Sequence, residues 1–237
     1  MDITDRVIII TGASAGIGLA TATHLSDLGA RLVLAARDTD ALHHLEGQLP
    51  GSMAVPTDIT QPDQAARLVE QTLDRHGRID VLVNNAARAM AAPVEHIDLD
   101  AYSHLLELNL LAPLRLMQLV IPTMRAHGGG HIVTISSQAS TKAIPYIAGY
   151  ASTKSALDTL SLTARTELAD DDITVSIIKP GIVDTDFGQN TPHPEPDELR
   201  RAPDGTLHPH IISPTTVAHA VADILRTGDA VIDLIPA

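Results

Sequence analysis

Short, almost wholly apolar runs recur along the chain, with segments of helical periodicity between them. The runs lie at 6–10, 31–36, 52–56, 80–85, 131–136, 174–179 and 230–235. Most are hydrophobic at every position rather than at alternate positions, which is typical of strands in a sheet covered by helices on both faces. Helical spacing covers 16–28, 62–76, 100–126, 150–169 and 214–226. This alternation predicts an α/β fold with a doubly wound parallel sheet of about seven strands.

No internal repeat or linker divides the 237 residues, so we expect a single domain over 1–237. One stretch differs from the rest: residues 186–213 contain five prolines and show no periodicity. A long irregular segment inside a compact domain usually has a functional role. We therefore expect 186–213 to form a lid that covers a substrate.

Charge and composition exclude several classes of function. The net charge of −13 argues against nucleic acid or an anionic membrane as the main partner, because both require clustered Lys and Arg. The absence of cysteine excludes disulfides and thiolate chemistry. The first apolar run is too short for a signal peptide, and no later run approaches the length of a membrane span. We expect a cytoplasmic protein.

A glycine-rich turn follows the first predicted strand. Gly12, Gly16 and Gly18 lie in the segment TGASAGIG, where the chain must reverse and begin a helix. Glycines at such a turn let the backbone approach a phosphate, and the helix N-terminus supplies free N–H groups. A plain strand-to-helix turn is the simpler alternative. The strand before the glycines and the amphipathic helix after them favour dinucleotide binding.

A tyrosine and a lysine four residues apart form a second candidate site. The chain has only three tyrosines, one phenylalanine and no tryptophan, yet Tyr150 precedes Lys154 by one helical turn. This spacing also recurs by chance, with a packed tyrosine and a solvated lysine. On a helix the two side chains share a face, however, and a cation beside a phenol favours the phenolate.

Several further motifs accompany these two in a fixed order. They are TGASAGIG, TDIT, NNAA, ELN, SS, YASTK and PGIVDT. With glycines spaced G-x-x-x-G-x-G, the chain resembles the short-chain dehydrogenase/reductase family over essentially its whole length. The resemblance implies a Rossmann-type fold. It also implies an oxidoreductase that interconverts a carbonyl and a secondary alcohol by hydride transfer, with a small-molecule substrate.

The resemblance assigns four catalytic residues. Tyr150 would be the general acid/base, and Lys154 would favour its phenolate and hold the nicotinamide ribose. Ser137, rather than its neighbour Ser136, would hold the substrate oxygen, and Asn109 would bind a water that connects Lys154 to solvent. Two simpler alternatives stay open. The serine pair is also typical of a turn, and Asn109 within LLELNLLAPL is also typical of a hydrogen-bonded core amide.

The resemblance also implies a cofactor site. Asp58 matches the aspartate that contacts adenine, and Thr185 matches the threonine that holds the nicotinamide carboxamide. Ala87 departs from the family's usual N-N-A-G. The full predicted set is Gly12, Ser14, Gly16, Ile17, Gly18, Arg37, Asp58, Ile59, Asn84, Ala86, Tyr150, Lys154, Pro180, Gly181, Ile182 and Thr185.

The end of the second strand indicates which cofactor is preferred. An acidic residue there would bind the ribose 2′-hydroxyl of NAD(H) and repel a 2′-phosphate. This chain has Ala36 followed by Arg37, and a guanidinium suits a phosphate. Asp38 and Ala15, where many NADP-preferring members carry a basic residue, weaken the signal. We expect NADP(H) to be preferred over NAD(H).

Other features lead to weaker expectations. His193, His208 and His210 lie in the irregular stretch without a spacing that completes a metal site, so we expect no metal. The run Asp170, Asp171, Asp172 is typical of a solvated turn.

Two rival functions remain at this stage: an extended-type nucleotide-sugar epimerase or dehydratase, and a non-catalytic NAD(P)-sensing protein. The resemblance implies a homodimer or homotetramer packed through the helices that carry Asn109 and Tyr150. The substrate itself cannot be read from the sequence.

Overall fold

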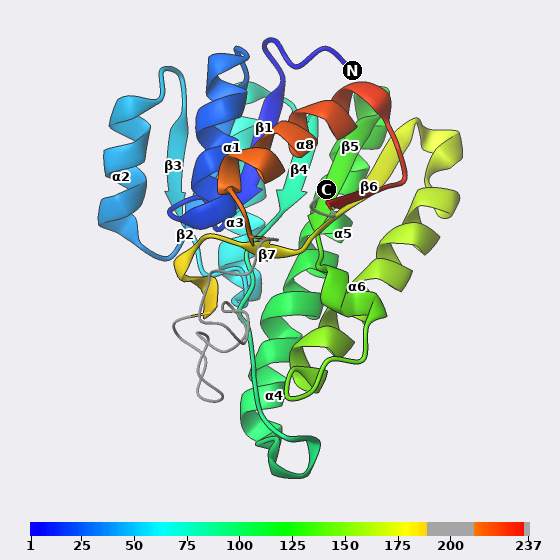
Figure 1. Ribbon diagram of the computed structural model, residues 1–237. Coiled ribbons are helices and arrows are strands. Elements are labelled where there is room, and N and C mark those ends of the chain that lie inside the picture. The colour runs from blue at the N-terminus through cyan, green and yellow to red at the C-terminus, as the bar shows by residue number, and fades with distance from the viewer. Residues whose placement is uncertain (189–210, 235–237) are drawn as a thin grey trace.

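A parallel seven-stranded sheet forms the centre of the computed structural model, which describes residues 1–188 and 211–234 (Figure 1). The strand order is β3-β2-β1-β4-β5-β6-β9, and every pair is parallel. The predicted doubly wound, single-domain α/β fold is confirmed. The strands are β1 Val7–Thr11, β2 Arg31–Ala36, β3 Met53–Pro56, β4 Val81–Asn84, β5 Gly130–Ile135, β6 Ile173–Pro180 and β9 Val231–Leu234.

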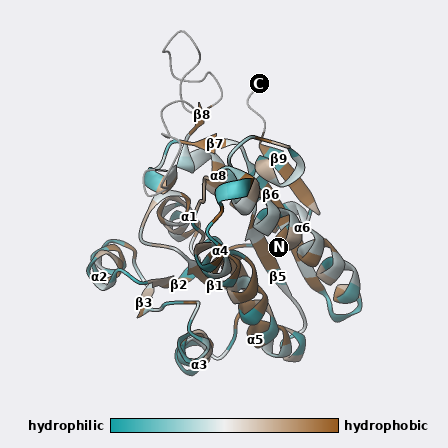
Figure 2. Cartoon of the chain, turned by 90° about the horizontal axis from the view of Figure 1, so that it is seen from below, coloured by the Kyte–Doolittle hydropathy of each residue, from teal (hydrophilic) through white to brown (hydrophobic). Residues whose placement is uncertain are grey.

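Helices cover both faces of this sheet (Figure 2). The first face holds α1 Gly16–Asp27, α2 Thr39–Gln48 and α8 Pro214–Thr227; the second holds α3 Pro62–His76, α5 Ala112–Ala126 and α6 Ala148–Glu167. Helix α4, Leu99–Leu106, precedes α5, and short helical turns occupy Val94–His96 (η1), Gln138–Thr141 (η3), Ala169–Asp171 (η4) and Asp186–Gly188 (η5). The predicted turn at Asp170 to Asp172 overlaps η4.

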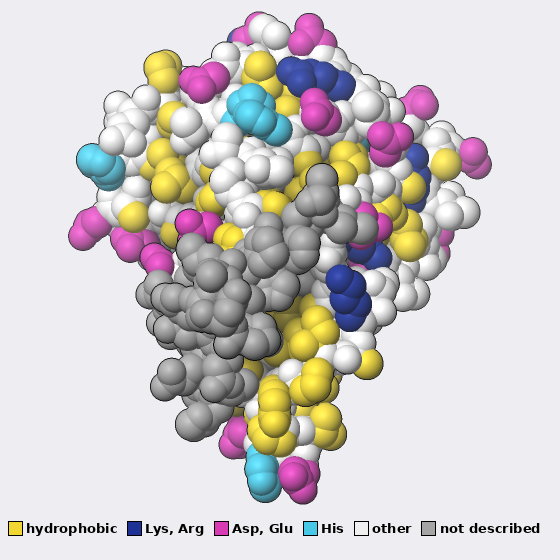
Figure 3. Space-filling model, viewed as in Figure 1, with side chains coloured by type: hydrophobic (Ala, Val, Ile, Leu, Met, Phe, Trp, Pro, Cys, Tyr) yellow, Lys and Arg dark blue, Asp and Glu magenta, His cyan; other side chains and the backbone are white. Residues whose placement is uncertain are grey.

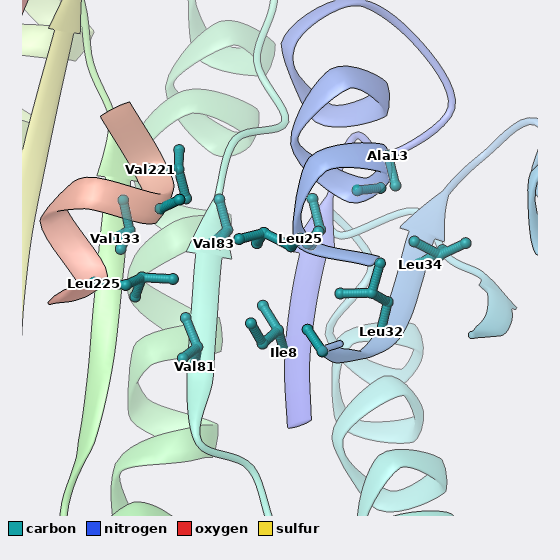
Figure 4. Packing of buried hydrophobic residues seen from close by; sticks show 14 of the residues in the cluster. Ile8, Ala13, Leu25, Leu32, Leu34, Val81, Val83, Val133, Val221 and Leu225 are labelled. Atoms are coloured by element: carbon teal, nitrogen blue, oxygen red, sulfur yellow. The ribbon is translucent and has the colours of Figure 1, made fainter. Parts of the chain in front are cut away.

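Successive residues of each central strand enter opposite halves of the core. In β1, Ile8 and Ile10 pack with α1 and α8, whereas Val7 and Ile9 pack with α3 and α5. Figure 4 shows the first of these clusters, in which Leu25 of α1 and Val221 of α8 face the strands. Because both faces are buried, neither set of alternate positions can be polar. This is why the strands are apolar throughout.

The chain winds outward from β1 in both directions. It passes through β2 to β3, returns to β4 on the other side of β1, and continues to β5, β6 and β9. The connections that leave β1 and β4 therefore run to opposite faces of the sheet, toward α1 and α5. A crevice at such a switch point is where ligands bind in open α/β sheets. The glycine-rich turn lies directly after β1, at this crevice.

Helix α2 was absent from the sequence expectations. It has only two buried residues, Leu42 and Leu45, so its hydrophobic face is narrow. Its start is nevertheless encoded, because the Asp38 carboxylate accepts a hydrogen bond from Ala41 N at 3.0 Å. A capping aspartate of this kind stabilises a helix by about 1 kcal/mol.

The predicted helix at 100–126 is continuous but not regular. Helix α4 leads through a π-helical turn, η2 at Glu107–Leu111, into α5. Within the described residues, Leu99–Ala126 is the one helix long and apolar enough to cross a membrane, judged by length and mean hydropathy alone. Polar residues such as Arg115 and Gln118 interrupt its apolar run. One side of α5 lies against the sheet, with Leu116, Met117 and Val120 fully or almost fully buried. This side is part of the protein core.

The irregular stretch 186–213 is described only at its two ends. Two short strands, β7 Ile182–Val183 and β8 Ile211–Ile212, pair in parallel, so the point where the stretch begins lies beside the point where it ends. Residues 189–210 lie outside the described residues, and so do His193, His208 and His210. The lid stays a prediction.

Candidate active site

Most of the predicted site residues line one cleft at the carboxyl ends of the strands. Figure 3 shows hydrophobic side chains gathered on this face of the molecule, toward the end where α4 lies. Apolar side chains such as Met90, Ile144 and Phe187 contribute to the wall of the cleft. The predicted residues that line it are Gly12, Ser14, Gly16, Ile17, Arg37, Asp58, Ile59, Ala86, Ser137, Tyr150, Lys154, Pro180, Gly181, Ile182 and Thr185.

The glycine-rich turn brings bare backbone to the cleft. Gly12 has a φ of +66°, in the left-handed region that favours glycine. Gly18 is needed for a different reason: a Cβ there would lie 2.1 Å from the Gly12 carbonyl oxygen. Helix α1 begins at Gly16 without a side-chain cap from Ala15, so its first N–H groups are free for an anion. The turn fits a phosphate group.

Hydrogen bonds from Thr11 and Asn85 join this turn to the end of β4. Thr11 Oγ1 accepts from Asn85 N and Ala86 N at 3.0 and 3.1 Å. In return, the Asn85 side chain donates to Thr11 O at 2.8 Å. Asn85 also lines the cleft, whereas the predicted Asn84 is buried and donates to Pro113 O at 3.4 Å. The structure thus places Asn85, and not the side chain of Asn84, at the cleft.

Tyr150 and Ser137 meet in the cleft from different elements. Tyr150 lies in the first turn of α6, and Ser137 follows β5. Burial of the hydroxyl raises the pKa of Tyr150 to about 12, and a hydrogen bond with the Ser137 side chain opposes this rise. The ring of Phe187 contacts Tyr150 edge-on, with 5.9 Å between centroids. At neutral pH the phenol therefore carries its proton and sits beside a second hydroxyl.

Lys154 is a buried cation on the same face of α6. It is 3% exposed, and its Nζ donates to Ile135 O at the end of β5, at 2.9 Å. Burial lowers the pKa of Lys154 to about 8, while the carboxylate of Asp158 acts to raise it. The lysine thus stays largely protonated at neutral pH and still lines the cleft.

Asn109 lies behind the cleft rather than in its wall. It is fully buried in the π-helical turn, where its Oδ1 accepts from Arg88 N at 3.0 Å. Its Nδ2 donates to Arg88 O at 2.9 Å and to Thr153 Oγ1 at 3.1 Å. The side chain therefore ties the loop after β4 to α6, as the core alternative expected. The relay through water stays a prediction.

The end of β2 presents a cation to the cleft. Ala36 is buried there, Arg37 is exposed, and both line the cleft. The Asp38 carboxylate, which could have drawn Arg37 aside, caps α2 instead. Asp58, after β3, accepts from Thr60 N and Thr60 Oγ1 at 3.0 and 2.7 Å, which fixes its carboxylate at the edge of the cleft.

Sequence reasoning missed Thr11 and Asn85, although each lies inside a quoted motif. It also missed Asp158 and Lys179, which form a buried ion pair behind Lys154. The available signal was the spacing of Asp158, one helical turn after Lys154. Across residues 1–188 and 211–234, no group of three or more His, Cys, Asp or Glu side chains could hold a metal ion.

The sequence is similar to those of known proteins. A model of the short chain dehydrogenase family matches residues 6–196. An uncharacterized oxidoreductase of Staphylococcus saprophyticus is 33% identical over 224 residues, which cover 93% of this chain and 89% of that protein.

Solved structures are similar to this chain over nearly its whole length. A 7α-hydroxysteroid dehydrogenase complexed with NADH and 7-oxo glycochenodeoxycholic acid is 28% identical, with a TM-score of 0.87 and coverage of 98% of this chain and 94% of that one. An alcohol dehydrogenase from the archaeon Thermococcus sibiricus, complexed with 5-hydroxy-NADP, is 28% identical, with a TM-score of 0.84 and coverage of 97% and 96%.

Proposed function

Because the chain belongs to the short-chain dehydrogenase/reductase family and is an NAD(P)-dependent oxidoreductase, we propose that it uses NADP(H) to interconvert a carbonyl and a secondary alcohol. The observation that carries the proposal is the meeting of Tyr150, Ser137 and Lys154 in one cleft with the glycine-rich turn. An intact Tyr150–Lys154 pair counts against a protein that only senses the cofactor.

The residues of the cleft fit a dinucleotide. The free N–H groups at the start of α1 suit its phosphates, and Gly12 and Gly18 leave room for them. Thr185 and Ile182 would hold the nicotinamide end, with Asp58 and Ala86 at the adenine end. When bound, the nicotinamide supplies or accepts a hydride. Lys154 would bind the adjacent ribose through donors that Ile135 O leaves free.

The chain's own part in the reaction is proton transfer. Tyr150 holds a proton at neutral pH, so it can donate that proton to a carbonyl oxygen as negative charge develops there. Ser137 donates a second hydrogen bond to the same oxygen. Lys154 then stabilises the phenolate left behind, since an opposite charge nearby lowers the pKa of a phenol. In the oxidation of an alcohol, the same groups act in reverse.

Arg37 supports a preference for NADP(H). Its guanidinium lies at the cleft where a ribose 2′-phosphate would be held, and Ala36 leaves no carboxylate to repel that phosphate. A charge-assisted hydrogen bond contributes about 1.5–3 kcal/mol, which corresponds to roughly ten- to a hundredfold in affinity. Asp38 caps α2, but its negative charge is next to this site and opposes the phosphate, so we expect the lower end of the range.

A cofactor swap tests this preference. We expect the wild type to favour NADPH over NADH by about tenfold in kcat/KM, with a panel of carbonyl compounds followed at the nicotinamide absorbance. Ala36→Asp with Arg37→Ala should reverse the order, because the new carboxylate binds the 2′-hydroxyl and repels the phosphate. A wild type that favours NADH would show that the Arg37 argument is wrong. Absence of turnover with either cofactor and the whole panel would count against the activity itself.

We also expect a homodimer or homotetramer built through α5 and α6. Leu111, just before α5, is 45% exposed, and Leu162 on α6 is 40% exposed. Exposed leucines on neighbouring helices are typical of a surface that packs against another copy. A small-molecule substrate, no nucleic acid, no membrane partner and a cytoplasmic location complete the proposal.

A further inference from the structure

A buried ion pair lies directly behind the proposed catalytic lysine. Lys179 Nζ, at the end of β6, contacts Asp158 Oδ2 of α6 at 2.9 Å, and the two side chains are only 11% and 9% exposed. Asp158 follows Lys154 by one helical turn, so both side chains lie on the face of α6 that packs on β6. Three charged groups thus share one poorly solvated space.

The second oxygen of this carboxylate is buried without a partner. Within residues 1–188 and 211–234, Asp158 Oδ1 accepts no hydrogen bond, although a buried carboxylate oxygen without one is energetically unfavourable. This oxygen belongs to a carboxylate on the same helix face as Lys154, one turn further along α6.

The few lysines of this chain also suggest that the charge of Lys154 matters. Only three of the 16 basic residues are lysines: Lys142, Lys154 and Lys179. Lys142 lines the cleft, and the other two are buried beside Asp158. Arginine stays charged in any environment, whereas a buried lysine readily loses its proton. A negatively charged group near Lys154 would keep this buried lysine protonated.

We propose that Asp158, which Lys179 contacts from β6, is a positioning residue that keeps Lys154 protonated in its buried site. The inference rests on the proposed function, because a protonated Lys154 matters there through Tyr150. The carboxylate attracts the ammonium of Lys154, and little water screens the two charges. Lys179 contacts the same carboxylate from β6, so the negative charge of Asp158 is not left in the interior without a partner.

Other ionisable groups around α6 lie beyond its far end, have other partners or are exposed. Asp170 and Asp171 lie beyond the opposite end of α6, and Asp233 of β9 is in register with Lys179 but exposed. Tyr150 lies on α6 itself. The elements packed against α6 add Lys142 after η3, bound to Gln138, and Glu107 in η2, paired with Arg115. Helix α4 adds Tyr102, hydrogen-bonded to Ser152, and the exposed Asp100 and His104.

The test reads the protonation of Lys154 directly. With lysine isotope-labelled at Cε, the wild type gives three NMR signals, which Lys142→Arg and Lys179→Met assign by removing one each. We expect Asp158→Asn to lower the pKa of Lys154, about 8 in the wild type, by at least about one unit, a tenfold change in its ionisation constant. The same pKa in wild type and variant would overturn the proposal.

Two further variants make the result decisive. Asp80→Asn removes another buried, ion-paired carboxylate, which contacts Arg6 at 3.1 Å at the opposite end of the sheet, and should leave Lys154 unchanged. An equal shift in Asp80→Asn would also overturn the proposal. If Asp158→Asn does not fold, the double variant Asp158→Asn with Lys179→Met avoids an unpaired lysine and should give a smaller decrease, because it also removes a repelling charge. No decrease in the double variant would then reject the proposal.

Kinetics separate this inference from the proposed function. With any substrate that the wild type converts, Asp158→Asn should move the high-pH limb of kcat/KM to lower pH by the same amount as the Lys154 titration. If the ion pair were purely structural, Asp158→Asn would lower the stability of the fold and leave the high-pH limb in place. If the wild type converts no carbonyl or alcohol, the proposed activity fails, while the lysine titration still decides the role of Asp158.

Discussion

Gly18 is the position in the cofactor turn with the least space for a side chain. A Cβ there would lie 2.1 Å from the Gly12 carbonyl oxygen and 2.7 Å from Asn85 Nδ2. The first of these atoms belongs to the backbone, so it cannot rotate away as a flexible side chain could. Any larger residue must push the turn apart from the start of α1.

We therefore expect Gly18→Ala to lower the free energy of unfolding by about 1–3 kcal/mol, the usual effect of overpacking, and to weaken NADPH binding. Gly47→Ala is the matched control, since Gly47 also lies in a helix but a Cβ there meets nothing within 4 Å. The control should be neutral or stabilising by up to about 1 kcal/mol. Urea unfolding and a cofactor titration measure both, and equal stability of the two variants would contradict the argument.

The sequence allowed some site residues to be predicted and not others. Tyr150 and Lys154 could be predicted because their spacing within one helix is a local property. Asp158 shares that helix, but its importance depends on Lys179, which is distant in the sequence and reaches it only through the packing of β6 on α6. Local patterns cannot specify which strand will face a given helix turn.

At the scale of the elements, a buried histidine links β5 to β6. His131 is 2% exposed, and its Nε2 lies 2.8 Å from Ser176 Oγ, which in turn donates to Asp229 O. Burial, with smaller contributions from the positive N-terminus and Arg165, lowers the pKa of His131 to about 4. The folded protein therefore binds this proton less readily than the unfolded chain, whose histidine has a pKa near 6.5.

This difference predicts a loss of stability in acid. The contribution of His131 is complete above about pH 6.5 and decreases as the pH falls toward 4, by roughly 3 kcal/mol in total. His131→Gln should remove this pH dependence, so the stability advantage of the wild type over the variant should shrink between pH 7 and pH 4.5. The exposed His43→Gln serves as the control. An advantage that stays constant across this range would refute the assignment.

Helix α2 shows why the periodicity of apolar residues does not predict every helix. Its face against the core consists of Leu42 and Leu45, too few to produce a repeating apolar pattern. The local signal for its start is the capping aspartate, Asp38. The central strands were easier, because burial on both faces makes them apolar throughout.

At the scale of the whole molecule, the order of the strands creates the site. Winding outward from β1 leaves a crevice between the ends of β1 and β4, and the motifs that follow β1, β3, β4, β5 and β6 all reach it. The first of these motifs spans 11–18 and the last spans 180–185, so only the assembled sheet brings them together. Their order along the chain predicted the fold, whereas the distances between their side chains needed the structure.

The central claim is that Tyr150 transfers the proton in an NADP(H)-dependent reaction, and Tyr150→Phe tests it most directly. The variant should lose at least about a hundredfold in kcat, the lower range for a general acid, with the Kd for NADPH nearly unchanged. Tyr146→Phe, altering a half-exposed tyrosine four residues earlier, should keep wild-type activity. Turnover of Tyr150→Phe close to that of the wild type would contradict the account.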